Sequence, residues 1–299
     1  TFLTDGTTSQ SYAQVFDQAD ALFRDTRRGL VLIFCERTAE TVTAYVGALR
    51  AGLVPLLIDE STRSGSLTRL LERYVPDYVF APQGLEVSEG WELNLEFGSG
   101  CLWRRRSDAP GSALHDDLRL LLTTSGSTGD PKTVRLTARN IQSCTDEICQ
   151  YLSMNAQVRA LALLPLHYSY GLSVLHCCMN SRATLVLSQK SVLDRDFWAF
   201  IEEMQITDLA GVPFIFEIMH RMRIPGAVMQ NLRCVTQAGG RLDPRITKHF
   251  TTLFAGSGVD YFTMYGQTEA GPRIAYLPPE HAEEKLGAVG ISLACGQAR

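Results

Sequence analysis

The 299-residue sequence has no apolar run near the roughly 18 residues that cross a bilayer. Its longest apolar stretches, residues 30–34 and 161–165, have the length of β-strands. It also has no excess of positive charge, because 28 basic and 32 acidic residues give a formal net charge of −4. Such a chain has no overall field that attracts nucleic acid or anionic lipid. We therefore expect a cytoplasmic protein with no nucleic-acid partner and no membrane partner.

The eight cysteines lack the CxxC spacing of redox and zinc sites, and they do not cluster as in small disulfide-linked domains. A chain of this length can bury a core without covalent links, and free cysteine is among the most buried residue types. We therefore predict reduced core residues at all eight positions. They are Cys35, Cys101, Cys144, Cys149, Cys177, Cys178, Cys234 and Cys295.

Short apolar segments alternate with amphipathic segments along most of the chain, a pattern typical of a parallel sheet covered by helices. Helices are predicted after Ser11 and near Thr38, which are suitable N-caps, and Gly52 suits the end of the second helix. The length predicts about two domains. Predicted strands cover residues 29–35, 53–59, 77–81, 118–124, 159–164, 183–187, 208–212, 234–238 and 259–264.

Two regions depart from this α/β rhythm. Residues 82–112 are rich in glycine, serine and charge, which predicts a loop-rich connection. Within it, Arg104, Arg105 and Arg106 are predicted to be solvated, because three adjacent side chains cannot all face one ligand. After Tyr276 the alternation of helix and strand patterns fades, which indicates a differently built segment.

The most informative segment is TTSGSTGDPK, residues 123–132, at the end of a predicted strand. Five hydroxyl side chains and two glycines fall in its first seven positions, and Lys132 follows. Hydroxyl groups, exposed backbone N–H groups and a fixed cation suit polyphosphate oxygens, although a plain solvent-exposed polar loop has the same composition. The segment lacks both GxxxxGK[ST] and GxSxG, which argues against a Walker-type NTPase and a serine hydrolase acting through Ser125.

This segment resembles the phosphate loop of the adenylate-forming superfamily, which comprises acyl-CoA synthetases, firefly luciferase and nonribosomal adenylation domains. Three further segments resemble segments of this superfamily and occur in the same order along the chain: LPLHYSYG at 164–171, QAGGRL at 237–242 and YGQTE at 265–269. The resemblance implies an AMP-binding N-terminal domain whose core, residues 1–275, has two α/β subdomains with largely parallel sheets. It also implies that residues 276–299 begin a small β-barrel subdomain and that a mobile C-terminal domain is absent.

The resemblance implies activation of a carboxylic acid by ATP, release of pyrophosphate, and transfer of the acyl group to a thiol. ATP, Mg²⁺ and coenzyme A or a phosphopantetheine-bearing acyl carrier protein are the expected cofactors and partners. The family's ribose-binding aspartate and adenylation lysine have no match in this sequence, so we expect the chain alone to be poorly active. A non-catalytic nucleotide- or acyl-binding module that retains the fold is the alternative.

The resemblance also implies roles for individual residues. The catalytic set is Thr268, Glu269, Lys132 and His167, with Glu269 as the metal ligand. Thr268 would bind the α-phosphate and Tyr265 would stack on adenine. The remaining nucleotide-binding residues are Thr124, Ser125, Gly126, Ser127, Thr128, Gly129, Gly239, Gly240 and Gly266.

The substrate class depends on the segment around His167. Relatives that activate amino acids carry an aspartate here to pair with the α-ammonium, whereas this sequence reads His167-Tyr168-Ser169-Tyr170 without an acid. A buried ammonium without a counter-ion is costly, so an aryl or aliphatic acid is favoured over an α-amino acid. His167 itself either lies beside the substrate carboxylate or is a packing histidine. Its spacing from His176 does not place the two imidazoles on one helix face as metal ligands.

Overall fold

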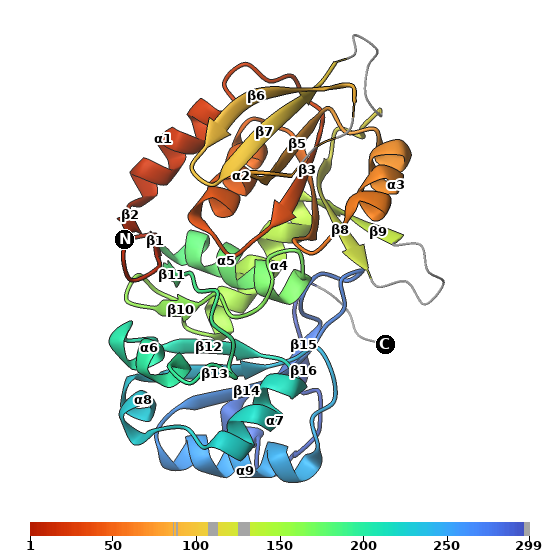
Figure 1. Cartoon of the computed structure of the whole chain (residues 1–299). Coiled ribbons are helices and arrows are strands. Elements are labelled where there is room, and N and C mark those ends of the chain that lie inside the picture. Colours follow the sequence, from red (N-terminus) through yellow and green to blue (C-terminus); the bar gives the residue numbers. More distant parts are fainter. Residues whose placement is uncertain (86, 88, 107–112, 125–131, 296–299) are drawn as a thin grey trace. The chain divides into compact units, whose positions relative to one another are not determined.

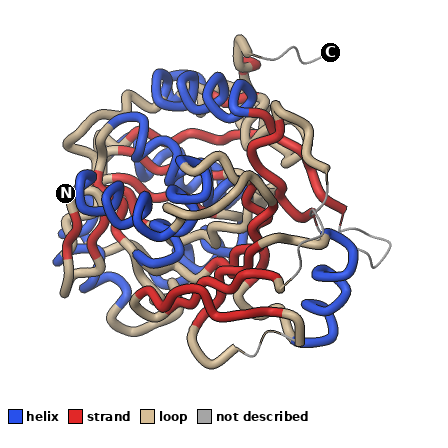
Figure 2. Tube along the Cα trace, turned by 90° about the horizontal axis from the view of Figure 1, so that it is seen from above, coloured by secondary structure: helices blue, strands red, loops and turns tan. Residues whose placement is uncertain are grey.

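The computed structural model describes residues 1–85, 87, 89–106, 113–124 and 132–295. Two compact units divide the chain: unit 1 contains Thr1–Ser9, Ile141–Leu164 and Ser169–Arg299, and unit 2 contains Gln10–Asn140 and Pro165–Tyr168. Each unit has its own β-sheet with helices packed on it (Figure 1), and helices and strands account for most of the described chain (Figure 2). The predicted α/β class with two largely parallel sheets is confirmed.

Unit 2 contains a seven-stranded sheet in the order β6-β7-β5-β3-β4-β8-β9, in which β3, β4, β5 and β8 are parallel. Alternate residues of β3 and β4 contact α3 on one face, and α2 covers the other face, so both strands are buried. The elements are α1 (Tyr12–Leu22), β3 (Leu30–Cys35), α2 (Ala39–Arg50), β4 (Val54–Asp59), α3 (Ser64–Tyr74), β5 (Tyr78–Pro82), β6 (Trp91–Phe97), β7 (Gly100–Arg105), β8 (Leu118–Thr124) and β9 (Lys132–Thr137).

The two predicted helix starts are confirmed with their caps. Ser11 accepts a hydrogen bond from the backbone N–H of Gln14, whose side chain accepts one from the Ser11 backbone N–H, so the two residues form a capping box. Thr38 caps α2 with a single hydrogen bond, which its side-chain hydroxyl accepts from the backbone N–H of Thr41. Gly52 follows α2 at φ +73°, a conformation in which glycine avoids the strain of a side chain.

The prediction of a loop-rich connection over residues 82–112 was wrong for its central part. β6 and β7 form an antiparallel hairpin that continues the sheet at its edge beside β5. The apolar residues of β6 alternate with polar ones as in a strand, but most of its side chains are exposed, and the composition of the whole region favoured a loop. Of the three arginines, Arg105 is partly buried and pairs with Asp77 at 3.4 Å, whereas Arg106 stays exposed.

Unit 1 contains a nine-stranded sheet in the order β16-β15-β14-β13-β12-β10-β11-β1-β2. The strands from β14 to β1 are parallel, and α9 lies along the side of β14 (Figure 1). The elements are β1 (Leu3–Thr4), β2 (Ser9–Gln10), α4 (Ala138–Tyr151), β10 (Arg159–Leu161), α5 (Ser169–Ser181), β11 (Thr184–Val186), α6 (Phe197–Glu203), β12 (Asp208–Gly211), α7 (Pro213–Met222), α8 (Gly226–Asn231), β13 (Cys234–Gln237), α9 (Pro244–Gly256), β14 (Asp260–Tyr265), β15 (Ala275–Leu277), a 3₁₀ turn (Pro279–His281) and β16 (Ile291–Ser292).

The segment after Tyr276 continues the sheet of unit 1. β15 pairs antiparallel with β14, and β16 pairs antiparallel with β15. Among the described residues the strands form no closed barrel. Where the start of a barrel was expected, β15 and β16 extend the sheet of unit 1 at its edge. The boundary proposed at residue 275 stays a prediction.

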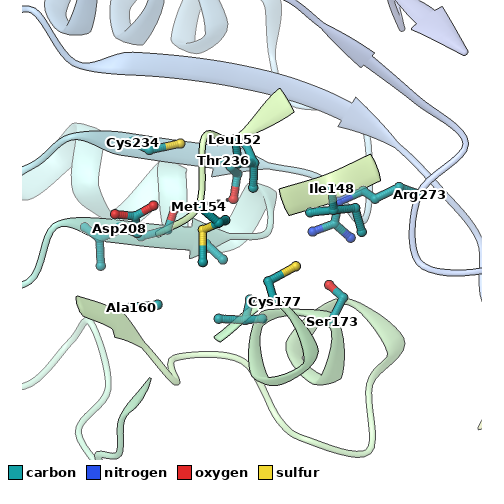
Figure 3. A pocket seen from close by; sticks show the side chains of 13 residues that line it. Ile148, Leu152, Met154, Ala160, Ser173, Cys177, Asp208, Cys234, Thr236 and Arg273 are labelled. Atoms are coloured by element: carbon teal, nitrogen blue, oxygen red, sulfur yellow. Dashed lines mark hydrogen bonds between the residues drawn. The ribbon is translucent and has the colours of Figure 1, made fainter. Parts of the chain in front are cut away.

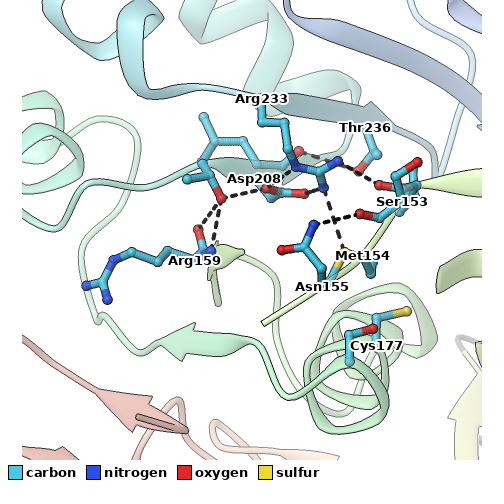
Figure 4. Close-up of polar contacts among 12 residues, drawn as sticks. Ser153, Met154, Asn155, Arg159, Cys177, Asp208, Arg233 and Thr236 are labelled. Carbon is cyan, nitrogen blue, oxygen red and sulfur yellow. Dashed lines mark hydrogen bonds and ion pairs between the residues drawn. The ribbon is translucent and has the colours of Figure 1, made fainter. Parts of the chain in front are cut away.

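An ion-pair network joins the parallel strands of unit 1. Arg233 pairs with both carboxylate oxygens of Asp208, donates to the backbone carbonyl of Leu152 at 2.7 Å and lies beside Met154 (Figure 4). Thr207 donates to Asp208 at 2.6 Å. Burial raises the pKa of Asp208, and Arg233 and Thr207 oppose that shift. The network satisfies a buried carboxylate at the start of β12.

The cysteine prediction is confirmed at seven positions and wrong at one. All eight cysteines are free thiols, and seven are buried, but Cys295 is exposed. Cys295 follows the last strand, where no further element packs over it in the described chain. In the part of the chain that the structure describes, no helix has the length and apolar composition needed to traverse a bilayer.

Candidate functional site

Two of the segments singled out in the sequence lie at one edge of the sheet in unit 1. β13 ends at Gln237, and β14, its parallel neighbour, ends at Tyr265. Because neighbouring parallel strands end at the same edge, QAGGRL and YGQTE follow the carboxyl ends of adjacent strands. In open α/β sheets this edge is where ligands bind.

The glycine pair makes a tight turn between β13 and α9. Gly239 has φ +83°, which a residue with a side chain rarely adopts. The side-chain amide of Gln237 donates to the carbonyl of Gly240 at 2.9 Å and holds the turn closed. A Cβ atom on Gly240 would lie 3.2 Å from Pro213 Cγ, at the start of α7. The two glycines therefore allow close packing of backbone at the ligand-binding edge.

The loop after β14 carries Tyr265, Gly266, Thr268 and Glu269. Tyr265 is 46% exposed, so its ring is available to a ligand and does not belong to the core. Gly266 lies so close to the segment that leads into β15 that a Cβ atom would be 2.1 Å from the carbonyl oxygen of Pro272. Glu269 is also exposed. The loop thus presents an aromatic ring, a hydroxyl and a carboxylate from a tightly folded backbone.

Helix α5 holds this loop at both ends. The hydroxyl of Ser169 lies 3.1 Å from the hydroxyl of Thr268, within hydrogen-bond distance. The next residue, Tyr170, stacks under the guanidinium of Arg273, with 3.9 Å between Arg273 Cζ and the ring centroid. Arg273 is 3% exposed and also contacts Met264 at the end of β14. Neither Ser169 nor Arg273 was predicted as a supporting residue, because Ser169 has no assigned role within LPLHYSYG and Arg273 lies beyond YGQTE.

In unit 2, the phosphate-loop resemblance falls on the connection of a β-hairpin. Thr124, the last residue of β8, is the cross-strand partner of Lys132, the first residue of β9. The Thr124 hydroxyl donates to the Lys132 carbonyl at 3.3 Å. The predicted phosphate-binding residues between them, Ser125, Gly126, Ser127, Thr128 and Gly129, lie outside the described residues. The hairpin fixes both ends of the segment at the edge of the sheet.

His167 lies in the same unit, beside the carboxyl end of β4. Its Nε2 is 3.4 Å from Oδ2 of Asp59, the last residue of β4. β4 and β8 are parallel neighbours, so Asp59 and Thr124 follow the same sheet edge. Unit 2 therefore brings together His167, Asp59 and the two ends of the hydroxyl-rich connection.

Protonation of this pair is set by burial and by its neighbours. Burial lowers the pKa of His167, and the carboxylates of Asp59 and Glu60 oppose that shift. For Asp59, burial would raise the pKa, but hydrogen bonds from Ser61 and the charges of His167 and Arg63 outweigh it and hold the pKa below its usual value. The carboxylate is therefore ionised at neutral pH.

Other histidines and a separate cavity are not part of this arrangement. Burial lowers the pKa of His176 to about 4, and no group of three or more metal-binding side chains is present among the described residues. A cavity of about 30 Å³ in unit 1 is lined by apolar side chains together with Ser173, Asp208 and Arg273 (Figure 3). It has room for about one or two water molecules and cannot hold a nucleotide.

The aromatic side chains of α5 and α7 in unit 1 differ in exposure. Phe216 is fully buried and packs edge-on against Phe250, so it belongs to the core. Tyr170 is also buried, and its hydroxyl donates to the carbonyl of Thr236 at 2.9 Å. Phe214, at 56% exposure, remains available to contact a ligand.

A family model described as "AMP-binding enzyme" matches residues 1–299. The chain belongs to this family. Feruloyl-CoA synthase of Amycolatopsis is 26% identical over 178 residues, which are 59% of this chain and 35% of that protein. L-proline–[L-prolyl-carrier protein] ligase of Pseudomonas fluorescens is 25% identical over an alignment of 270 residues, and the match covers 82% of this chain and 52% of that protein. The chain thus spans about a third to about a half of the length of these curated relatives.

The same fold occurs in o-succinylbenzoate coenzyme A synthetase from Bacillus subtilis, solved in complex with ATP and magnesium ion. The TM-score is 0.76 at 22% identity, and the match covers 98% of this chain and 62% of that one. The structural likeness shows that this chain has a known fold.

Proposed function

We propose that this chain provides the ATP-binding and acid-binding part of an enzyme that joins a carboxylic acid to a thiol with formation of AMP. A carboxylate oxygen attacks the α-phosphorus of ATP, the bond from that phosphorus to the bridging oxygen breaks, and pyrophosphate leaves. The thiol then attacks the acyl carbon, and AMP leaves. The observation that carries the proposal is the position of Thr268 and Glu269, directly after β14 and beside the glycine turn that follows β13.

The hairpin of unit 2 supplies the phosphate contacts. Hydroxyl and backbone N–H groups from Thr124 to Gly129 bind the β- and γ-phosphates, and Lys132 adds a positive charge. Phosphoryl transfer depends mainly on positioning and on stabilising charge at the phosphate oxygens. A hydroxyl-rich connection whose ends are tied by cross-strand pairing suits that task.

The loop of unit 1 supplies the contacts to the rest of the nucleotide. The exposed ring of Tyr265 stacks on adenine, Gly239 and Gly240 leave space for the nucleoside, and Thr268 binds the α-phosphate. Glu269 fits a magnesium ligand, because it is an exposed carboxylate next to the phosphate-binding threonine, and Mg²⁺ prefers few carboxylates together with phosphate oxygens. The bound ion would neutralise phosphate charge.

The acid is an aryl or aliphatic carboxylic acid, and an α-amino acid is disfavoured. The segment from His167 to Tyr170 carries no carboxylate to pair with an α-ammonium. The relatives include a feruloyl-CoA synthase and an L-proline ligase, so they favour neither class of acid. The preference for an aryl or aliphatic acid follows from this chain's own residues. The acceptor thiol belongs to coenzyme A or to a phosphopantetheine-bearing carrier protein.

The test is ATP–pyrophosphate exchange by the natural polypeptide with a panel of aryl, aliphatic and amino acids. We expect exchange with an aryl or aliphatic acid and none above background with amino acids. Lys132→Ala and Glu269→Ala should each reduce exchange about 100-fold, because each removes a charge that stabilises the phosphates or the metal. Lys248→Ala and Glu284→Ala, at exposed positions outside the site, are matched controls and should leave exchange unchanged.

Two outcomes would contradict the proposal. Exchange that survives both Lys132→Ala and Glu269→Ala would show that these residues do not hold the nucleotide. Binding of ATP and Mg²⁺ by calorimetry, without exchange for any acid class, would identify a non-catalytic binding module instead.

A further inference from the structure

The carboxylate of Asp59 is held in one orientation at the end of β4. Its Oδ1 accepts the backbone N–H of Ser61 at 2.6 Å, a hydrogen bond typical of an aspartate that begins a turn. This contact directs Oδ2 toward Nε2 of His167, at 3.4 Å. The imidazole therefore faces an anchored negative charge through one of its two nitrogens.

The other nitrogen of His167 has no hydrogen-bond partner within the described part of the chain. Its Nδ1 is buried and makes no hydrogen bond to any of the described residues. A neutral imidazole has one N–H and one acceptor nitrogen, and the N–H is favoured on the side that faces a carboxylate. Nδ1 is then the acceptor in the neutral ring and a donor in the imidazolium. Leaving a buried polar atom unpaired costs about 1–3 kcal/mol, so a ligand that supplies a partner gains part of this energy.

Charged groups lie at the ends of β3 and β4 and at the start of α3. Asp59 is the last residue of β4 and Glu60 follows it, Arg63 precedes α3, and Glu36 and Arg37 follow β3. The carboxylates of Asp59 and Glu60 act on His167 and favour its protonated form against burial. Burial and the charge of Glu60 raise the pKa of Glu36.

We propose that Asp59 is a positioning residue for His167. Asp59 keeps Nε2 of His167 protonated and turns Nδ1 toward the carboxylate of the acid that is activated. The inference rests on the proposed function, because that function names the ligand. An incoming carboxylate favours the imidazolium, whose Nδ1–H then donates to one carboxylate oxygen, while Asp59 balances the positive charge. The other carboxylate oxygen stays available to attack the α-phosphorus.

The first test uses no substrate and follows His167 by NMR in ¹³C,¹⁵N-histidine-labelled protein between pH 5 and pH 8. The signal is assigned from its loss in His167→Gln. Asp59→Asn keeps the shape of the side chain and an oxygen for Ser61, but removes the charge. We expect this variant to lower the pKa of His167 and to shift the neutral ring from the Nε2–H tautomer to a mixture. Glu36→Gln removes a charge at the end of the neighbouring strand and should change neither property.

The second test is kinetic. Asp59→Asn should raise KM for the acid about tenfold, the factor expected for one lost charge-assisted hydrogen bond, and leave KM for ATP nearly unchanged. An unchanged pKa and tautomer of His167 in folded Asp59→Asn would overturn the inference, whatever the kinetics. An absence of exchange in the unaltered protein would instead count against the proposed function, and the NMR result would still decide the role of Asp59.

Discussion

The hydrogen bond between Ser169 and Thr268 gives a quantitative prediction about catalysis. Ser169 is buried at the start of α5, and its hydroxyl lies 3.1 Å from that of Thr268. Ser169→Ala removes this contact without adding bulk. A neutral hydrogen bond has a net value of about 0.5–1.5 kcal/mol, which corresponds to a factor of about 2 to about 13 in kcat/KM. We expect a loss within this range in ATP–pyrophosphate exchange.

A double-mutant cycle separates positioning from other effects. Thr268→Val should reduce exchange more than Ser169→Ala does, because it removes the hydroxyl that contacts the phosphate. In the Thr268→Val background, Ser169 has no hydroxyl partner, so Ser169→Ala costs little there, the two losses should not add, and the coupling energy should be about 0.5–1.5 kcal/mol. Both variants should retain the melting temperature within a few degrees.

Ser173→Ala is the matched control for this cycle. Ser173 is buried on the same helix, but its hydroxyl donates to the carbonyl of Tyr170 at 2.6 Å and not to Thr268. Its replacement should show no coupling to Thr268→Val. Strictly additive losses for Ser169→Ala and Thr268→Val, or an equal coupling for Ser173→Ala, would refute the role assigned to the Ser169 hydroxyl.

Three further predictions concern the backbone, the pH dependence and the ion pair. Gly266→Ala would place a methyl group 2.1 Å from a backbone carbonyl oxygen, so the loop must shift and ATP–pyrophosphate exchange should fall about 100-fold. Gly256→Ala, at a position with open space around it, should instead raise the free energy of unfolding by about 0.5–1 kcal/mol in urea titrations. Burial lowers the pKa of His176 to about 4, so the unfolded chain binds a proton at this residue before the folded protein does as the pH falls. The free energy of unfolding should therefore drop by at most about 3 kcal/mol between about pH 6.5 and pH 4. His176→Gln should flatten this decline, and an unchanged slope in this variant would contradict the role given to His176. Asp208→Ala leaves Arg233 without its carboxylate and should lower the unfolding free energy by about 3 kcal/mol; a loss below about 1 kcal/mol would mean that the pair contributes little.

The sequence allowed the central parallel strands to be predicted because they are buried on both faces. β3 and β4 read as nearly continuous apolar runs and β8 has three consecutive buried leucines, and the bounds of all three strands agree with the predicted ranges within one residue. β6 and β7 were missed because the glycine, serine and charge of the surrounding region favoured a loop, although the apolar residues of β6 alternate with polar ones and the first half of β7 is buried. Edge strands are recognised by pairing, which a single sequence does not display.

The candidate site divides in a similar way. Tyr265, Thr268 and Glu269 could be found because they form a compact motif, and the structure places them after β14 as a strand-to-loop junction. Asp59 and Ser169 act through partners that are 108 and 99 residues away in the chain. Such partners become visible only when strand order and register are known.

The N-terminal strand has a consequence for the order of events during synthesis. Leu3 of β1 pairs with Leu185 of β11, about 180 residues later in the chain. At about 5–20 residues per second, a ribosome takes about 10–40 s to produce the partner after β1 has emerged. During this interval Phe2 and Leu3, both fully enclosed in the finished protein, have no sheet to join. A nascent chain of this protein therefore exposes this apolar strand to chaperones until β11 has been made.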